Sequence, residues 1–112
     1  MEKNGENFPN IDREEGQLAL YVALRAIEAL RPLTDEELRL AANTAIDADM
    51  KYMAEAKVDR GAVYDEEAAF LAIKRAMAAA LPQRRAHWED LADFAMEAWE
   101  VYLDAAGVIE WD

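Results

Sequence analysis

The side chains that could do chemistry in this chain are mostly carboxylates, and they gather toward its C-terminal end. Residues 86–112 contain eight Asp and Glu residues and no Lys or Arg, in a chain of 112 residues with a net charge of −12. At about 100° per helical residue, most of these acids share one face about 100° wide. The acids on that face are Glu89, Asp90, Asp93, Glu97, Glu100 and Asp104.

A helix face of one charge with no base nearby is typical of a surface that binds a partner of the opposite charge. We therefore expect a non-enzymatic interaction module that presents this face to a basic protein surface. An inhibitor or DNA mimic, whose carboxylates imitate phosphates, is one form of that function. The alternative interpretation of such a face is an ordinary solvated helix surface. The residues expected to contact the partner are Glu89, Asp93, Glu97, Glu100 and Asp104.

Spacing within the same face also permits metal chemistry. Asp90 and Asp93 are three residues apart, and two carboxylates at that spacing can share a divalent cation. Glu97 and Glu100 repeat the spacing. Together with Asp49, these acids define the alternative function, a metal-dependent phosphohydrolase or a ligand-binding helical bundle. The pattern is too general to assign a metal, a cofactor or a catalytic residue, so we expect none.

Asp49 is an acid that the helical pattern places on an apolar face, between Ala45 and Met53. A carboxylate that leaves water needs a partner or a proton. Asp49 is therefore a functional acid, one half of an ion pair between helices, or an acid exposed by a rotation of its helix. Arg25 and Arg75 are the candidate bases for such a pair.

Basic residues gather just before the acidic face. Arg84 and Arg85 fall at the expected start of a helix, where the helix dipole disfavours cations. An anion is expected to compensate them. An external anion or acidic partner could supply it, and so could local salt bridges such as Arg85 with Glu89, one turn further on.

The residue types that are missing exclude several classes of function. The chain has no Cys, no Ser and a single His, His87. A Ser or Cys nucleophile, a disulfide framework and a thiolate or multi-histidine metal site are therefore excluded. The acidic charge repels phosphate backbones and anionic lipids, so we expect no direct nucleic-acid or membrane binding. No basic segment followed by an apolar one opens the chain, and we expect a cytoplasmic protein.

The elements that must position these residues are all helical. Alanine is the commonest residue and β-branched residues are scarce, which predicts an all-α chain. Start and stop signals predict an antiparallel four-helix bundle, with helices at about 13–30, 35–58, 65–80 and 83–106. Residues 1–11 are polar and turn-rich, which predicts a mobile arm before a single helical domain at 12–112. A short C-terminal tail is expected after the last helix.

Two local signals set the helix boundaries most firmly. Thr34 is expected to cap the second helix in a capping box with Glu37, and Leu33 and Leu38 can pack across that cap. Pro82 is expected to separate the third helix from the fourth, because proline removes a backbone donor and clashes within a helix. The alternative is one continuous helix with a kink at Pro82.

The first and fourth helices carry more apolar surface than one neighbouring helix covers. In the fourth, the apolar arc spans more than about 200°. In the first, apolar side chains that include Leu18 and Val22 leave only a narrow polar strip. We expect a second copy to cover this surplus in a homodimer, unless the bundle covers it alone.

Overall fold

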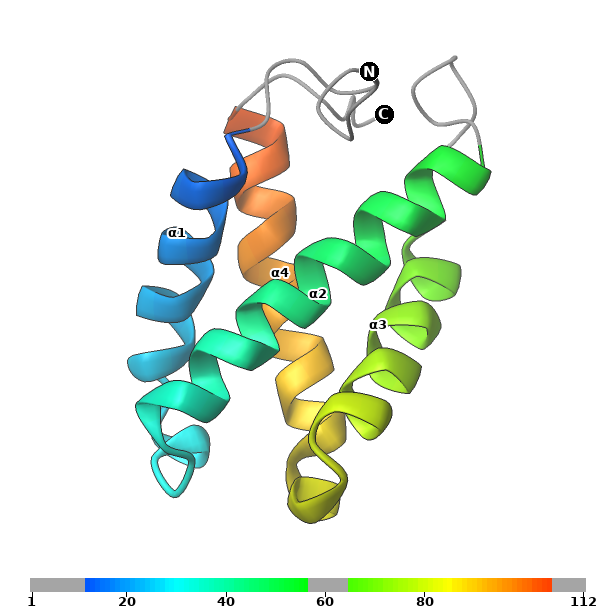
Figure 1. Cartoon of the computed structure of the whole chain (residues 1–112). Helices are drawn as coiled ribbons and strands as arrows, with labels where there is room; N and C mark the ends of the chain where they lie inside the picture. The colour runs from blue at the N-terminus through cyan, green and yellow to red at the C-terminus, as the bar shows by residue number, and fades with distance from the viewer. Residues whose placement is uncertain (1–11, 57–64, 106–112) are drawn as a thin grey trace.

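The computed structural model describes residues 12–56 and 65–105, and these form four α-helices with no strand among them (Figure 1). This confirms the all-α prediction. The predicted N-terminal arm, the two predicted helix ends at 58 and 106, and the C-terminal tail lie outside the described residues. In chain order the elements, with η for a short 3-10 helix, are α1 Arg13–Arg25, η2 Glu28–Leu30, α2 Asp35–Glu55, α3 Glu66–Ala80, η4 Pro82–His87 and α4 Trp88–Ala105.

Consecutive α-helices run in opposite directions, as the bundle prediction requires. Figure 1 shows α1 beside α4, with α2 crossing diagonally in front of α4 and α3 on the other side of the bundle. Both α1 and α3 pack against α2 and α4, and α2 also packs against α4. The four helices therefore enclose one apolar core.

Side-chain caps start α1, α2 and α3. The Thr34 hydroxyl accepts a hydrogen bond from the Glu37 amide at 3.1 Å, and the Glu37 carboxylate accepts one from the Thr34 amide at 2.8 Å. The predicted capping box is thus present. Asp12 and Asp65 cap α1 and α3 through their side chains. Each cap satisfies amide groups that have no partner within the helix.

The first helix is shorter than predicted. It was expected to reach about residue 30, but α1 ends at Arg25, and Ile27 is extended, with φ −83° and ψ 122°, before η2 begins. The Arg25 guanidinium donates to the carbonyl oxygens of Arg31 and Leu33, both at 3.4 Å, and so closes the turn. Leu30 and Leu33 are both buried as a result. Apolar burial and these hydrogen bonds together stabilise the break.

The third and fourth helices are separate, as expected from Pro82. Leu81 leaves the helical region, with φ −129° and ψ 62°. The α-helix that follows starts at Trp88 and not at residue 83, because residues 82–87 form a 3-10 helix with Arg84 in a non-helical conformation. The Trp88 indole donates to the Leu81 carbonyl oxygen at 2.8 Å. That bond satisfies an acceptor left open at the end of α3.

Helices α1 and α4 meet where Gly16 faces Trp99. A Cβ atom on Gly16 would lie 2.7 Å from Cζ3 of Trp99, closer than real side chains approach. Trp99 is fully buried and stacks on Tyr102, with ring centroids 5.2 Å apart. The Tyr102 hydroxyl accepts a hydrogen bond from the Asp12 amide at 2.8 Å. These contacts fix the rotation of α4 about its own axis.

An ion pair joins η4 to the start of α2. Arg84 donates to both carboxylate oxygens of Glu37, at 3.0 and 2.8 Å, and to the Pro32 carbonyl oxygen at 3.2 Å. The two side chains are only 26% and 16% exposed. The Arg84 guanidinium, helped by the Thr34 amide, lowers the pKa of Glu37 to about 2.

We expect Glu37→Gln to lower the melting temperature by about 4 °C at neutral pH, because Gln keeps the capping acceptor but loses the ionic contact with Arg84. Ionised Glu37 stabilises the fold above its usual pKa of 4.5, and this contribution is lost as the pH falls toward 2. Thermal melts across this range should therefore show the gap between wild type and variant closing. Glu36→Gln, at an exposed neighbour, is the control. A gap of constant size would contradict the assignment.

Candidate functional site

The outer side of α4 carries a row of exposed carboxylates. Its inner side is fixed by Trp99, Leu91 and Leu103, which are fully buried. The opposite side is turned to solvent. None of its exposed acids forms an ion pair within the described part of the chain. We call this row the α4 acidic face, and it consists of Glu89, Asp93, Glu97 and Asp104.

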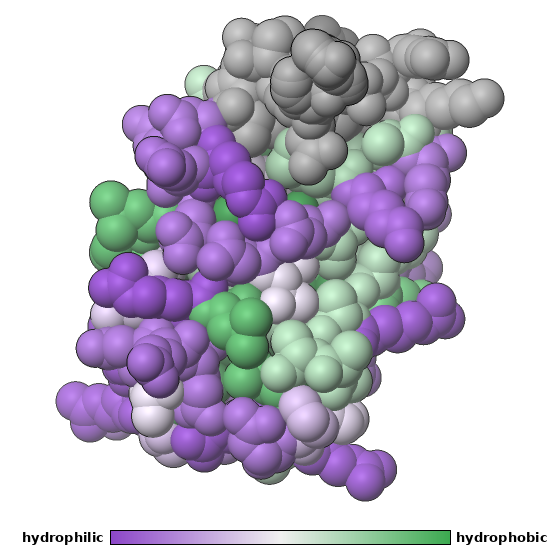
Figure 2. Space-filling model, viewed as in Figure 1, coloured by the Kyte–Doolittle hydropathy of each residue, from purple (hydrophilic) through white to green (hydrophobic). Residues whose placement is uncertain are grey.

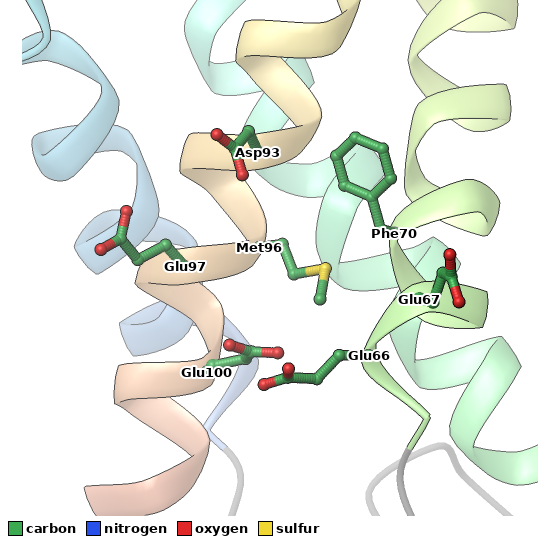
Figure 3. A pocket seen from close by; sticks show the side chains of 7 residues that line it. All are labelled: Glu66, Glu67, Phe70, Asp93, Met96, Glu97 and Glu100. Atoms are coloured by element: carbon green, nitrogen blue, oxygen red, sulfur yellow. The ribbon is translucent and has the colours of Figure 1, made fainter.

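Glu100 belongs to the predicted row but lies at its border. Its side chain is half-buried and points from α4 toward Glu66 on α3 (Figure 3). Burial, together with the charges of Glu66, Asp49 and Glu97 and a hydrogen bond with Glu66, raises the pKa of Glu100 to about 7. Oε2 of Glu100 is shielded from solvent and accepts no hydrogen bond from a described residue. Glu100 is therefore the acid of α4 that holds a proton most readily.

A groove runs between α3 and α4 beside the α4 acidic face. It is a shallow depression of about 650 Å³ that is widely open to solvent. Phe70 and Met96 lie between the two helices and pack against the core, so they form an apolar floor (Figure 3). Carboxylates line the remaining wall. They are Glu66, Glu67, Asp93, Glu97 and Glu100.

Asp49 is buried on α2, as its position on the apolar face predicted. Its charge acts on Glu100, so it adds to the negative field on the inner side of the groove. Arg25, one of the two bases considered for it, instead donates to Asp35 at 2.7 Å. The other, Arg75, is exposed on α3.

The two arginines considered for anion binding differ in the structure. Arg84 is held by a salt bridge to Glu37, which lies 47 residues away in the sequence, so its partner is internal but not local. Arg85 is exposed, and its guanidinium lies 6.0 Å from the centre of the Trp88 ring. The anion that compensates Arg84 is thus part of the fold.

Metal ligation has no assembled site in the described ranges. Within residues 12–56 and 65–105, no group of three or more His, Asp or Glu side chains is arranged to hold a metal ion. Of the predicted pair, Asp93 is exposed and Asp90 is half-buried. The metal-dependent alternative therefore gains no support from the positions of these residues.

Comparison with known proteins adds no function. No protein-family model, curated protein or solved structure matches the chain. In the described residues, every helix is too short or too polar to cross a lipid bilayer.

The groove was not predicted from the sequence, although a signal for it exists. Glu66 starts a helix, where an acid is already explained by the helix dipole. Glu66 precedes Phe70 by four residues, and Met96 precedes Glu100 by four. Residues four apart share a helix face. On antiparallel helices in contact, this repeated pattern places acid opposite acid and apolar side chain opposite apolar side chain.

We expect Glu100→Gln to stabilise the protein increasingly as the pH rises. Because the pKa of Glu100 is raised, ionising this side chain opposes folding. The wild type therefore becomes less stable as the pH rises from 4.5, the usual pKa of a glutamate, to about 7. The variant lacks that loss. Urea unfolding should give equal stabilities near about pH 4 and a more stable variant near about pH 8. Glu89→Gln, on the exposed row, is the control. A variant no more stable than wild type near about pH 8 would contradict the assigned position of Glu100.

Proposed function

We propose that this protein is a non-enzymatic interaction module that binds a basic protein surface through the α4 acidic face. The observation that carries the proposal is a row of exposed carboxylates that no described base neutralises. The row runs from Glu89 to Asp104. At 1.5 Å per residue, its length of about 22 Å is enough to contact several basic side chains.

The spacing of the acids in this row favours the binding of a basic partner. Glu89, Asp93 and Glu97 follow one another at intervals of four residues. Like charges at that spacing destabilise a helix slightly. A basic partner would remove this repulsion and gain attraction at every turn. Binding of this kind weakens with salt, because exposed charges are screened over about 10 Å at 0.1 M ionic strength.

An inhibitor that imitates DNA is one form of this function. Its carboxylates would occupy a groove that normally holds phosphates, and the partner would be a nucleic-acid-binding protein. The chain itself would still not bind nucleic acid, since its net charge of −12 repels phosphates.

A homodimer remains a prediction and is supported by α1. Leu18 and Val22 are 56% and 57% exposed and lie one turn apart on the outer side of that helix. Other apolar side chains are exposed elsewhere, and Figure 2 shows patches of them on a mostly hydrophilic face. The cytoplasmic location also remains a prediction.

The proposal is tested by removing three charges either from α4 or from positions outside α4. The first variant combines Asp93→Asn, Glu97→Gln and Asp104→Asn. A matched variant with the same net charge combines Glu28→Gln, Glu36→Gln and Glu55→Gln, all at exposed positions away from α4. Binding of a short oligolysine peptide is measured by calorimetry at low salt.

We expect the α4 variant to bind at least about tenfold more weakly than wild type, and the matched variant to stay within about threefold. The reason is that the peptide should contact the row on α4 and not the protein's charge as a whole. Equal weakening in both variants would show that only net charge matters, and would contradict a binding face on α4.

A further inference from the structure

We propose that the groove between α3 and α4 is the anchor site for one lysine or arginine side chain of the basic partner, with an apolar neighbour of that residue packed on Phe70 and Met96. This inference rests on the proposed function and adds where the partner is held. The described residues identify the kind of side chain that the groove fits.

The shape and the chemistry of the groove match a basic side chain. Its floor is apolar and its wall is acidic. Lysine and arginine have the complementary form, an apolar stem that ends in a cation. A volume of about 650 Å³ exceeds what one side chain fills, so the groove has room for the cation and for part of an apolar neighbour.

The described lining of the groove also includes no basic side chain. Glu66 and Glu100 face each other across it, from different helices (Figure 3). Oε2 of Glu100 is shielded from water and has no hydrogen-bond donor among the described residues. A buried carboxylate oxygen without a donor is unfavourable. An ammonium or guanidinium group would supply donors to both facing carboxylates at once.

Glu100 holds its proton more readily than an ordinary glutamate does. Burial raises its pKa, and the charges of three acids, Glu66, Asp49 and Glu97, act in the same direction. A cation that enters favours the ionised form of Glu100, so the carboxyl loses its proton to solvent on binding. Binding should therefore tighten as the pH rises through about 7. The acids that face or line the site are Asp49 on α2, Glu66 and Glu67 on α3, and Asp93 and Glu97 on α4.

Other occupants are less well matched. A divalent cation finds no group of three ligands in the described ranges. A second copy of this acidic chain would bring a net charge of −12 toward an acidic wall. A basic side chain matches both the apolar floor, through its stem, and the acidic wall, through its charge.

The test uses the full chain with its methionine methyl groups labelled with carbon-13, because Met96 lies on the floor of the groove. The probe is an acetylated peptide with a central arginine between two leucines. Two control peptides replace the arginine by neutral citrulline, of nearly the same shape, and by glutamate. The Met96 signal is assigned with Met96→Leu.

We expect the arginine peptide to shift the Met96 methyl signal, and to bind at least about tenfold more tightly than the citrulline peptide. Its affinity should rise between about pH 6 and pH 8. Glu66→Gln and Glu100→Gln should each weaken it, whereas Glu36→Gln, at an exposed position on α2 outside both the groove and the α4 acidic face, should not. Because Glu66 is exposed, its variant keeps the test decisive if Glu100→Gln disturbs the fold.

Three results would overturn the anchor site. They are equal binding of the citrulline peptide, binding unchanged by Glu66→Gln, and a Met96 shift that depends on protein concentration alone, which would indicate a second copy in the groove. None of these would affect oligolysine binding through the α4 acidic face. Failure of the anchor is thus distinguishable from failure of the proposed function.

Discussion

The packing of Trp99 against Gly16 is the constraint on which the rest of the structure depends. An indole this large can be buried between α1 and α4 only if the facing position has no side chain, and a Cβ on Gly16 would lie 2.7 Å from the ring. Tyr102 stacks on this ring, and the Tyr102 hydroxyl accepts a hydrogen bond from the Asp12 amide just before α1. Once Trp99 is placed, the rotation of α4 is set, and with it the direction in which every other side chain of that helix points.

The acidic surface follows from that rotation. Side chains opposite Trp99 must face solvent, which is where Glu89, Asp93, Glu97 and Asp104 lie. Glu100 is close enough to α3 to be drawn into the groove beside Glu66, where burial raises its pKa. One helix thus carries acids in two environments. The exposed ones suit long-range attraction of a basic partner, and the half-buried one suits a close contact that excludes water.

Local sequence signals predicted the helices and the bundle well. They could not predict contacts between segments that are distant in the sequence. The capping box of Thr34 and Glu37 and the break at Pro82 depend on neighbours in sequence, so both could be anticipated. The pairing of Arg84 with Glu37 joins segments 47 residues apart, and no periodicity indicates it. The same holds for Glu66 and Glu100, because a helical projection gives the face of one helix but not the neighbour that covers its edge. Asp49 was correctly placed on a buried face, while its effect on Glu100 needed the packed bundle.

The most direct measurement is a map of backbone amide shifts in the nitrogen-15-labelled protein as an oligolysine peptide is added. If α4 holds the binding surface, the largest shifts will fall at Glu89, Asp93, Glu97 and Asp104, and they will disappear as salt is raised. Shifts of equal size at the acidic first turns of α2 and α3 would mean that the peptide follows negative charge wherever it occurs. That result would contradict a dedicated binding face on α4.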